Sequence, residues 1–169
     1  MKHTLCCSLI IGLFASATHA TSPETPVALK SAGLTHITSV VQPDRLQAQN
    51  KQTVLAFYEA GLNQKDFAAA SKYLGPYYKQ HNPNAADGIE GFRNFVNYLK
   101  EKVPTSHSEI RQVFADGDFV ILHVHKTSSP TDRGVAIVDI FRLEQGKIVE
   151  HWDVTQAIPE KTASGNPMF

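Results

Sequence analysis

The sequence predicts an α+β domain in which helices cover one face of an antiparallel sheet. Apolar residues recur at helical spacing before Pro104 and at a spacing of two after it. The segments that follow Pro104 are separated by short turn signals such as Asp116-Gly117, which are typical of consecutive hairpins. A run of helices followed by a run of strands favours an α+β arrangement.

Three helices are expected in the first part of the domain. Asp44 and Asp66 are good N-caps, and each precedes residues with apolar side chains at helical spacing. Gly75-Pro76 is expected to end the second helix, and Tyr77–His81 is expected to be a brief extended segment. The expected helices are 45–62, 67–74 and 88–102.

Four strands are expected after the helices, because apolar residues alternate with others along each of them. Asp116-Gly117 and Gln145-Gly146 are expected to close hairpins, and 128–132 is expected to be a longer loop. The expected strands are 106–115, 118–127, 133–144 and 147–156.

The start of the chain has the features of an export signal. Lys2 supplies a positive charge, residues 5–17 are apolar with small residues, and Ala20 is suited to precede a cleavage point. We therefore expect a periplasmic or secreted protein with no stable membrane insertion after cleavage, and a retained anchor helix is the alternative. The expected parts are a signal peptide 1–20, a flexible lead segment 21–43, a domain 44–160 and a tail 161–169.

The composition excludes several kinds of site. The only cysteines, Cys6 and Cys7, lie in the predicted signal, so the rest of the chain has no thiol for a disulfide, a nucleophile or a thiolate metal site. The chain has 16 basic and 16 acidic residues and no basic stripe, so nucleic acid is not an expected partner.

Two carboxylates, Asp139 and Asp153, interrupt the apolar pattern of 134–156. A carboxylate that points into a core is costly unless it is paired, hydrogen-bonded or used in chemistry. Both are therefore candidate catalytic residues. The structural alternatives are an ion pair of Asp139 with Arg133 or Arg93, and backbone hydrogen bonds accepted by Asp153 at the end of its strand.

Two phrases of the sequence, YYKQHNPNAADGIEGFRNF and DIFRLEQGKIVEHWDV, resemble the SnoaL-like polyketide cyclases of the nuclear transport factor 2-like superfamily. The resemblance covers roughly residues 44–159. It implies a cone-shaped domain in which the helices and a curved antiparallel sheet enclose a cavity. It also implies aldol cyclisation or related proton-transfer chemistry.

The resemblance assigns roles residue by residue. In these cyclases the general base is an aspartate in a His-x-Asp phrase on the last strand, and His151-Trp152-Asp153 matches that phrase. A cavity-facing histidine of the cyclases aligns with Asp139, and a cavity-facing glutamine aligns with Ile137. The chain departs from the family pattern at these two positions, while an acid–base site is retained.

Four histidines are candidates for substrate binding: His81, His123, His125 and His151. His123 and His125 are two residues apart on one predicted strand, so they share a face. Such histidines can hydrogen-bond substrate oxygens or tune the aspartates. Together with a carboxylate they would also suit zinc or another divalent ion, and partly exposed sheet histidines are the structural alternative.

The expected function is acid–base catalysis without a cofactor on a small hydrophobic carbonyl compound, by aldol-type cyclisation, isomerisation or lyase chemistry. Asp153 would be the base, assisted by Asp139 and His125. The alternatives are a non-catalytic protein that binds a small ligand, and a metal-dependent lyase or hydrolase. A homodimer is expected, because the second face of strand 133–144 is also apolar.

Overall fold

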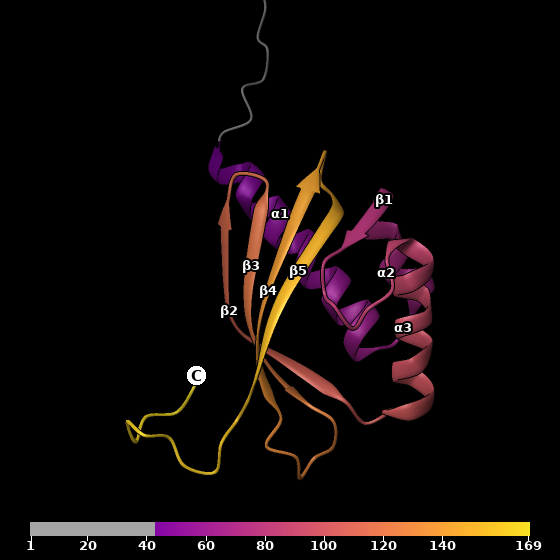
Figure 1. Cartoon of the computed structure of the whole chain (residues 1–169). Coiled ribbons are helices and arrows are strands. Elements are labelled where there is room, and N and C mark those ends of the chain that lie inside the picture. The colour runs from indigo at the N-terminus through magenta and orange to yellow at the C-terminus, as the bar shows by residue number, and fades with distance from the viewer. Residues whose placement is uncertain (1–42) are drawn as a thin grey trace, which may run out of the picture. The chain divides into compact units, whose positions relative to one another are not determined.

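The structure is a computed structural model that describes residues 43–169 (Figure 1). The predicted signal peptide 1–20 and all but the last residue of the lead segment 21–43 lie outside the described residues. The helices are α1 Pro43–Tyr58, α2 Phe67–Ala70 and α3 Gly88–Lys102, and the strands are β1 Leu74–Gln80, β2 His107–Asp116, β3 Phe119–Thr127, β4 Val135–Glu144 and β5 Lys147–Ala157. Within the described part, no helix combines the length and apolar character that crossing a membrane requires.

The five strands form one mixed sheet in the order β1-β5-β4-β3-β2. β2 to β5 are the predicted antiparallel meander. β1 pairs with β5 in parallel, which the hairpin signals did not predict. A parallel pair needs a long crossover connection, and here α3 and the first three strands of the meander lie between the two partners in sequence. The sheet is not closed, since β1 and β2 are its two edges.

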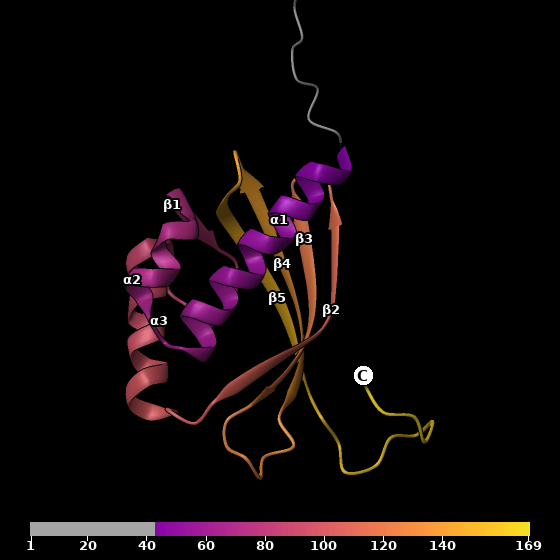
Figure 2. The same cartoon turned by 180° about the vertical axis from the view of Figure 1, so that it is seen from behind.

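The helices cover one face of this sheet, which we call the inner face (Figures 1 and 2). Alternate residues of β3, Val120, Leu122 and Val124, point to the inner face and are fully buried. The opposite, outer face carries Val138 and Val154, which are 41% and 72% exposed. The predicted α+β architecture, with helices on one face, is confirmed.

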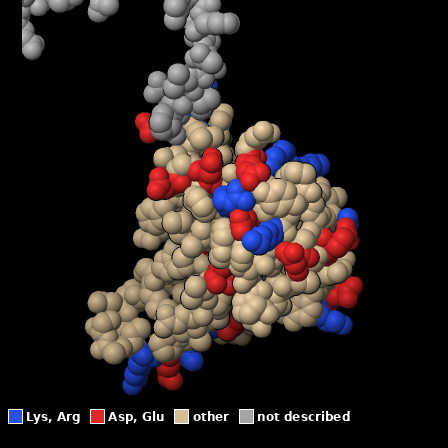
Figure 3. Space-filling view, turned by 45° about the horizontal axis from the view of Figure 1, so that its top comes forward, with Lys and Arg blue, Asp and Glu red and all other residues tan. Residues whose placement is uncertain are grey.

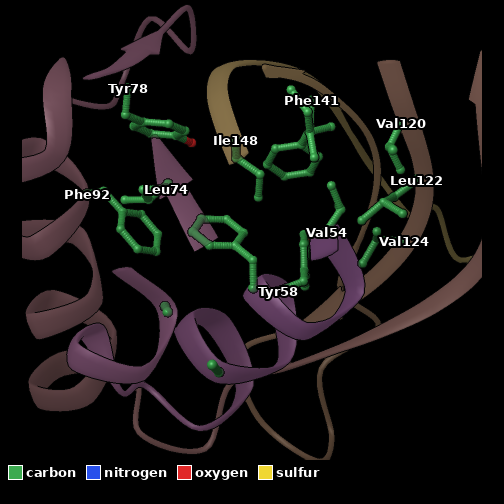
Figure 4. Close-up of a cluster of buried hydrophobic side chains, with 14 of the residues drawn as sticks. Val54, Tyr58, Leu74, Tyr78, Phe92, Val120, Leu122, Val124, Phe141 and Ile148 are labelled. Carbon is green, nitrogen blue, oxygen red and sulfur yellow. The ribbon is translucent and has the colours of Figure 1, made fainter. Parts of the chain in front are cut away.

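The core lies where α1 and α3 meet the inner face and β1 (Figure 4). Phe57 of α1 is at its centre. Its ring centroid is 4.8 Å from that of Phe92 on α3 and 5.9 Å from that of Phe141 on β4. Tilted and edge-on aromatic pairs of this kind contribute roughly 0.5–1.5 kcal/mol beyond their area of burial. They fix the position of α1 over the sheet.

The end of α1 differs from a regular helix. The predicted helix 45–62 consists of α1 followed by a π-helical turn, Glu59–Asn63. The Asn63 side chain clamps this turn to β2, because its Nδ2 donates to Ser108 O at 3.0 Å and its Oδ1 accepts from Ser108 N at 2.9 Å. Widened turns of this type recur at functional sites.

The second predicted helix, 67–74, is too long. Asp66 caps it as expected, accepting from Ala69 N at 2.9 Å, but α2 ends at Ala70 and a 3₁₀ turn follows. β1 then begins at Leu74 and includes Gly75 and Pro76. Proline is tolerated here because β1 is an edge strand, where one missing N–H need not break the sheet. The third predicted helix, 88–102, matches α3.

Candidate active site on the inner face

A pocket with a volume of about 200 Å³ lies between the inner face, α1, α3 and the segment after β1. Aromatic and aliphatic side chains, including Phe57, Phe92 and Ile137, form most of its wall. Its polar groups are gathered mainly on β4, β5 and the end of β1. They include Gln80, Asn82, Asp139, His151 and Asp153.

Strand register brings the two predicted catalytic carboxylates together. Asp139 on β4 lies directly opposite Asp153 on β5, so both side chains share the inner face. His151 is two residues before Asp153 and therefore points the same way. A carboxylate oxygen of each aspartate and a ring nitrogen of His151 all lie within 4.8 Å of one another.

Asp139 is 4% exposed and has two close partners. Its Oδ1 is 2.9 Å from His151 Nε2, and its Oδ2 accepts from the Tyr58 hydroxyl at 3.1 Å. The expected alternative, an ion pair with Arg133 or Arg93, is therefore wrong, since a histidine fills that place. Burial and the Asp139 carboxylate raise the pKa of Tyr58 well above its ordinary value, so the phenol stays protonated and donates.

The hydrogen bonds around His151 determine how many protons His151 and Asp139 hold between them. Gln80 Oε1 accepts from Asn82 N at 2.9 Å, which orients the Gln80 amide with its oxygen 3.0 Å from His151 Nδ1. Nδ1 must then carry a proton and donate it. The contact between Nε2 and Asp139 Oδ1 needs one more proton, held either as imidazolium and carboxylate or as imidazole and carboxylic acid. The pair therefore stores one transferable proton.

Asp153 is only partly buried, and Asn82 alone holds it. Asn82 Nδ2 donates to both carboxylate oxygens, at 2.8 Å and 2.7 Å. The Asn84 N–H donates to Asn82 Oδ1 at 2.7 Å, so the backbone fixes the orientation of this amide too. Among the described residues, no other group hydrogen-bonds the Asp153 carboxylate. Asp153 therefore keeps free lone pairs at the pocket, whereas Asp139 has a partner on each oxygen.

Tyr78 supplies a further donor at this end of the pocket. Its hydroxyl accepts from Gln80 Nε2 at 3.4 Å, and within residues 43–169 no hydrogen bond uses its own proton. Burial, followed by the Asp139 carboxylate, raises the pKa of Tyr78 above its ordinary value. The O–H remains available to bind an oxygen atom of a ligand.

Four of these residues were missed by the reasoning from sequence: Tyr58, Tyr78, Gln80 and Asn82. Three of them carried a signal. Tyr78 and Gln80 share one face of the predicted extended segment 77–81, and Asn82 continues the same spacing of two just beyond its end. Tyr58 occupied a core position of a helix, and nothing in the pattern separated it from its apolar neighbours.

His123 and His125 do not line this pocket. They lie opposite Val138 and Ala136 on the outer face, because they alternate with the buried residues of β3. His125 Nε2 is 2.8 Å from Arg133 O, and the Phe169 ring lies over both imidazoles with centroids 5.0 Å and 4.9 Å away. The structure therefore does not bring His123 and His125 to this pocket, and it does not place them beside Asp139, His151 and Asp153 in one metal-ligating group.

His81 also points away from the pocket, because it alternates with Gln80 and Asn82. Its Nε2 is 2.8 Å from Glu150 Oε1, and its ring stacks on Trp152 at 4.6 Å. The hydrogen bonds to His81 and Arg142 hold the pKa of Glu150 below its ordinary value. Of the four predicted histidines, only His151 reaches the pocket.

On the face shown in Figure 3, lysine and arginine side chains are interspersed with aspartate and glutamate side chains.

The sequence profile of the SnoaL-like polyketide cyclases matches residues 52–161. The chain belongs to the SnoaL-like polyketide cyclase family. The matched range includes every residue of the site described above. Among curated proteins, none matches the chain.

Solved structures show the same fold at low sequence identity. TsrD from Streptomyces laurentii has a TM-score of 0.55 and 23% identity, covering 65% of this chain and 90% of that one. A proposed polyketide cyclase from Acidithiobacillus ferrooxidans has a TM-score of 0.55 and 21% identity, covering 64% and 88%. AclR, a proposed hydroxylase from Streptomyces galilaeus, has a TM-score of 0.55 and 21% identity, covering 70% and 91%.

Asp139, His151 and Asp153 are also residue types that can hold a divalent ion. In this arrangement His151 Nε2 and Asp139 Oδ1 face each other at 2.9 Å, and Asn82 Nδ2 lies 2.8 Å and 2.7 Å from the two Asp153 oxygens. A metal ion would have to replace these contacts.

Proposed function

We propose that this family member is a cofactor-independent acid–base enzyme that acts on a small carbonyl compound, with Asp153 as the general base. One observation carries the proposal. Asp153 is the carboxylate with free lone pairs in an apolar pocket, and it lies beside the Asp139–His151 pair with its stored proton. An acid and a base that face the same small pocket are the requirement for moving a proton between two positions of one molecule.

The first step would be removal of a proton from the carbon next to the carbonyl. Asp153 takes the proton, and the electrons of the C–H bond move to the carbonyl oxygen to form an enolate. The Tyr78 hydroxyl can donate to that oxygen, and a fixed donor in an apolar site stabilises developing negative charge strongly. The enolate then either attacks a second carbonyl group, as in an aldol reaction, or takes a proton at another position, as in an isomerisation.

The size of the pocket favours a small substrate. Pockets for drug-sized ligands usually measure roughly 300–1,000 Å³, and this one measures about 200 Å³. A compound with a single ring or a short chain suits this volume. The apolar wall suits a hydrophobic body, and the cluster of polar groups suits one carbonyl group.

Proton exchange tests the proposal without knowledge of the natural substrate. Mono-aromatic ketones such as phenylacetone would be incubated with the protein in D₂O, and deuterium at the carbon next to the carbonyl would be followed by NMR. The wild type should accelerate exchange, and Asp153→Asn should remove the acceleration while the circular dichroism spectrum is kept. Asp116→Asn, an exposed aspartate at the β2–β3 turn, is the matched control and should exchange like the wild type.

Exchange that survives in Asp153→Asn would overturn the assignment of the base. A ketone that binds to the wild type and gains no deuterium would instead favour a non-catalytic protein that binds a small ligand.

A further inference from the structure

Lys126 brings a positive charge to a part of the pocket wall away from the carboxylates. It follows Leu122 and Val124 at alternate positions of β3, so it points to the inner face and contributes to the lining. Leu122 lies opposite Asp139, and Lys126 is four residues further along the strand. Four residues advance a strand by about 13 Å, so Lys126 and the carboxylates lie at different ends of the site.

The Lys126 ammonium has no anionic partner within residues 43–169. No carboxylate lies within ion-pair distance of it, and it makes none of the side-chain hydrogen bonds of the described residues. The Phe95 ring also lines the pocket, and its centroid is 5.9 Å from Lys126 Nζ. Lys126 is partly buried as a residue, and an ammonium group that loses hydration gains from an anionic partner.

Lys65 adds a second positive charge on the same side. Its Nζ donates to Ser106 O at 2.9 Å and to Asn63 O at 3.1 Å, so backbone carbonyls hold it in place. Ser106 lies two residues before Ser108, which pairs with Lys126, so Lys65 and Lys126 are on the same side of the sheet. Partial burial and the charge of Lys126 lower the pKa of Lys65. Of these two lysines, Lys126 lines the pocket, and it has no hydrogen-bond acceptor among the described residues.

We infer that Lys126 binds an anionic group of the ligand, so that the ligand is a small carbonyl compound that carries a carboxylate. The carbonyl half of this inference rests on the proposed function, whereas the anionic half rests on Lys126 alone. Among the residues that the structure describes, one lysine and no arginine line this pocket, which suits a monoanion better than a phosphate with its need for several donors. The Asp153 carboxylate repels an anion at the other end of the pocket, so the charges also set the orientation in which the ligand binds.

Equilibrium binding tests this inference separately from catalysis. Isothermal titration calorimetry would compare 4-acetylbenzoate with 4-acetylbenzamide, which has nearly the same shape and no charge. The wild type should bind the carboxylate on the order of tenfold more tightly, which is the effect of one charged hydrogen bond. Lys126→Met should remove this preference, Lys126→Arg should retain most of it, and the exposed control Lys100→Met should leave it unchanged.

The same titration in Asp153→Asn separates the two proposals. A preference for the carboxylate that persists in this variant supports the role of Lys126 whether or not the protein catalyses exchange. Equal affinity for the two compounds in the wild type, or a preference that survives Lys126→Met in a folded protein, would overturn the inference. Failure of the wild type to bind either compound would also overturn it.

Discussion

The hydrogen bond from Tyr58 to Asp139 gives the most direct test of the buried site. Tyr58→Phe removes only the hydroxyl and keeps the ring in the core. It leaves Oδ2 of a carboxylate that is 4% exposed without its donor at 3.1 Å. A hydrogen bond to a charged group contributes about 1.5–3 kcal/mol, and we expect the free energy of unfolding to fall by that amount.

Tyr77→Phe is the matched control, because it removes the same group from the surface. The Tyr77 hydroxyl donates to Glu144 at 2.7 Å, but Tyr77 is 43% exposed. Water can replace this bond, so the loss should be below about 1 kcal/mol.

Urea unfolding followed by circular dichroism measures both losses. In thermal unfolding, each kcal/mol should lower the midpoint by about 4 °C for a domain of this size. A loss in Tyr58→Phe that is no larger than the loss in Tyr77→Phe would refute the reasoning. A second check is the pair of variants Tyr58→Phe and Asp139→Asn, whose effects should be non-additive because the two residues share one bond.

Other variants and treatments test further parts of the structure. Burial raises the pKa of Tyr78, so the fold favours the protonated phenol, and the free energy of unfolding should fall as pH rises above about 10. This fall should be smaller in Tyr78→Phe, and an identical pH dependence would contradict the burial of the hydroxyl. Gly146→Ala should cost about 1–2 kcal/mol for its positive φ of 74° alone. Gly134→Ala should cost at least about 1 kcal/mol more in the same urea assay, because its new Cβ would also overlap the Lys126 carbonyl, and equal costs would contradict that contact. Chelation of divalent metals should leave ketone exchange unchanged, and loss of exchange that one divalent ion per chain restores would point to a metal enzyme. Mass spectrometry of the full chain after expression with an export pathway should show a product that lacks residues 1–20, and an uncleaved intracellular product would contradict the predicted signal.

Local patterns predicted most of the fold, because they report which elements form. Apolar residues at every second position after Pro104 predicted the antiparallel meander. The apolar stripe of residues 88–102 predicted α3 with its bounds. The parallel pairing of β1 with β5 depends on contacts between segments distant in sequence, which no local pattern records. Gly75 and Pro76 predicted the end of a helix and not part of a strand, since both residues are common at helix ends and rare inside strands.

The site was predictable to the extent that it depends on strand register. Asp139 and Asp153 meet because the hairpin between β4 and β5 closes where Gln145-Gly146 predicts. The orientation of the β3 histidines was not predictable, because β3 has apolar residues on both faces. Phe119 and Ile121 share the face of His123, so alternation alone could not decide which set turns inward.

Gln80 accepts a hydrogen bond from His151, and Asn82 donates to Asp153, so this site depends on which face of the segment between Pro76 and Pro83 turns inward. Inserting or deleting a single residue there would exchange the two faces of the segment. Lys79 and His81 would then face the carboxylates, and two amides would be replaced by two groups that can carry positive charge. Such a protein would lose the Tyr78 ring from its core but keep the meander and both aspartates, and the base would be held in an ion pair. Length variation in this short segment is therefore a route by which related chains could gain or lose proton-transfer chemistry without any substitution of a catalytic residue.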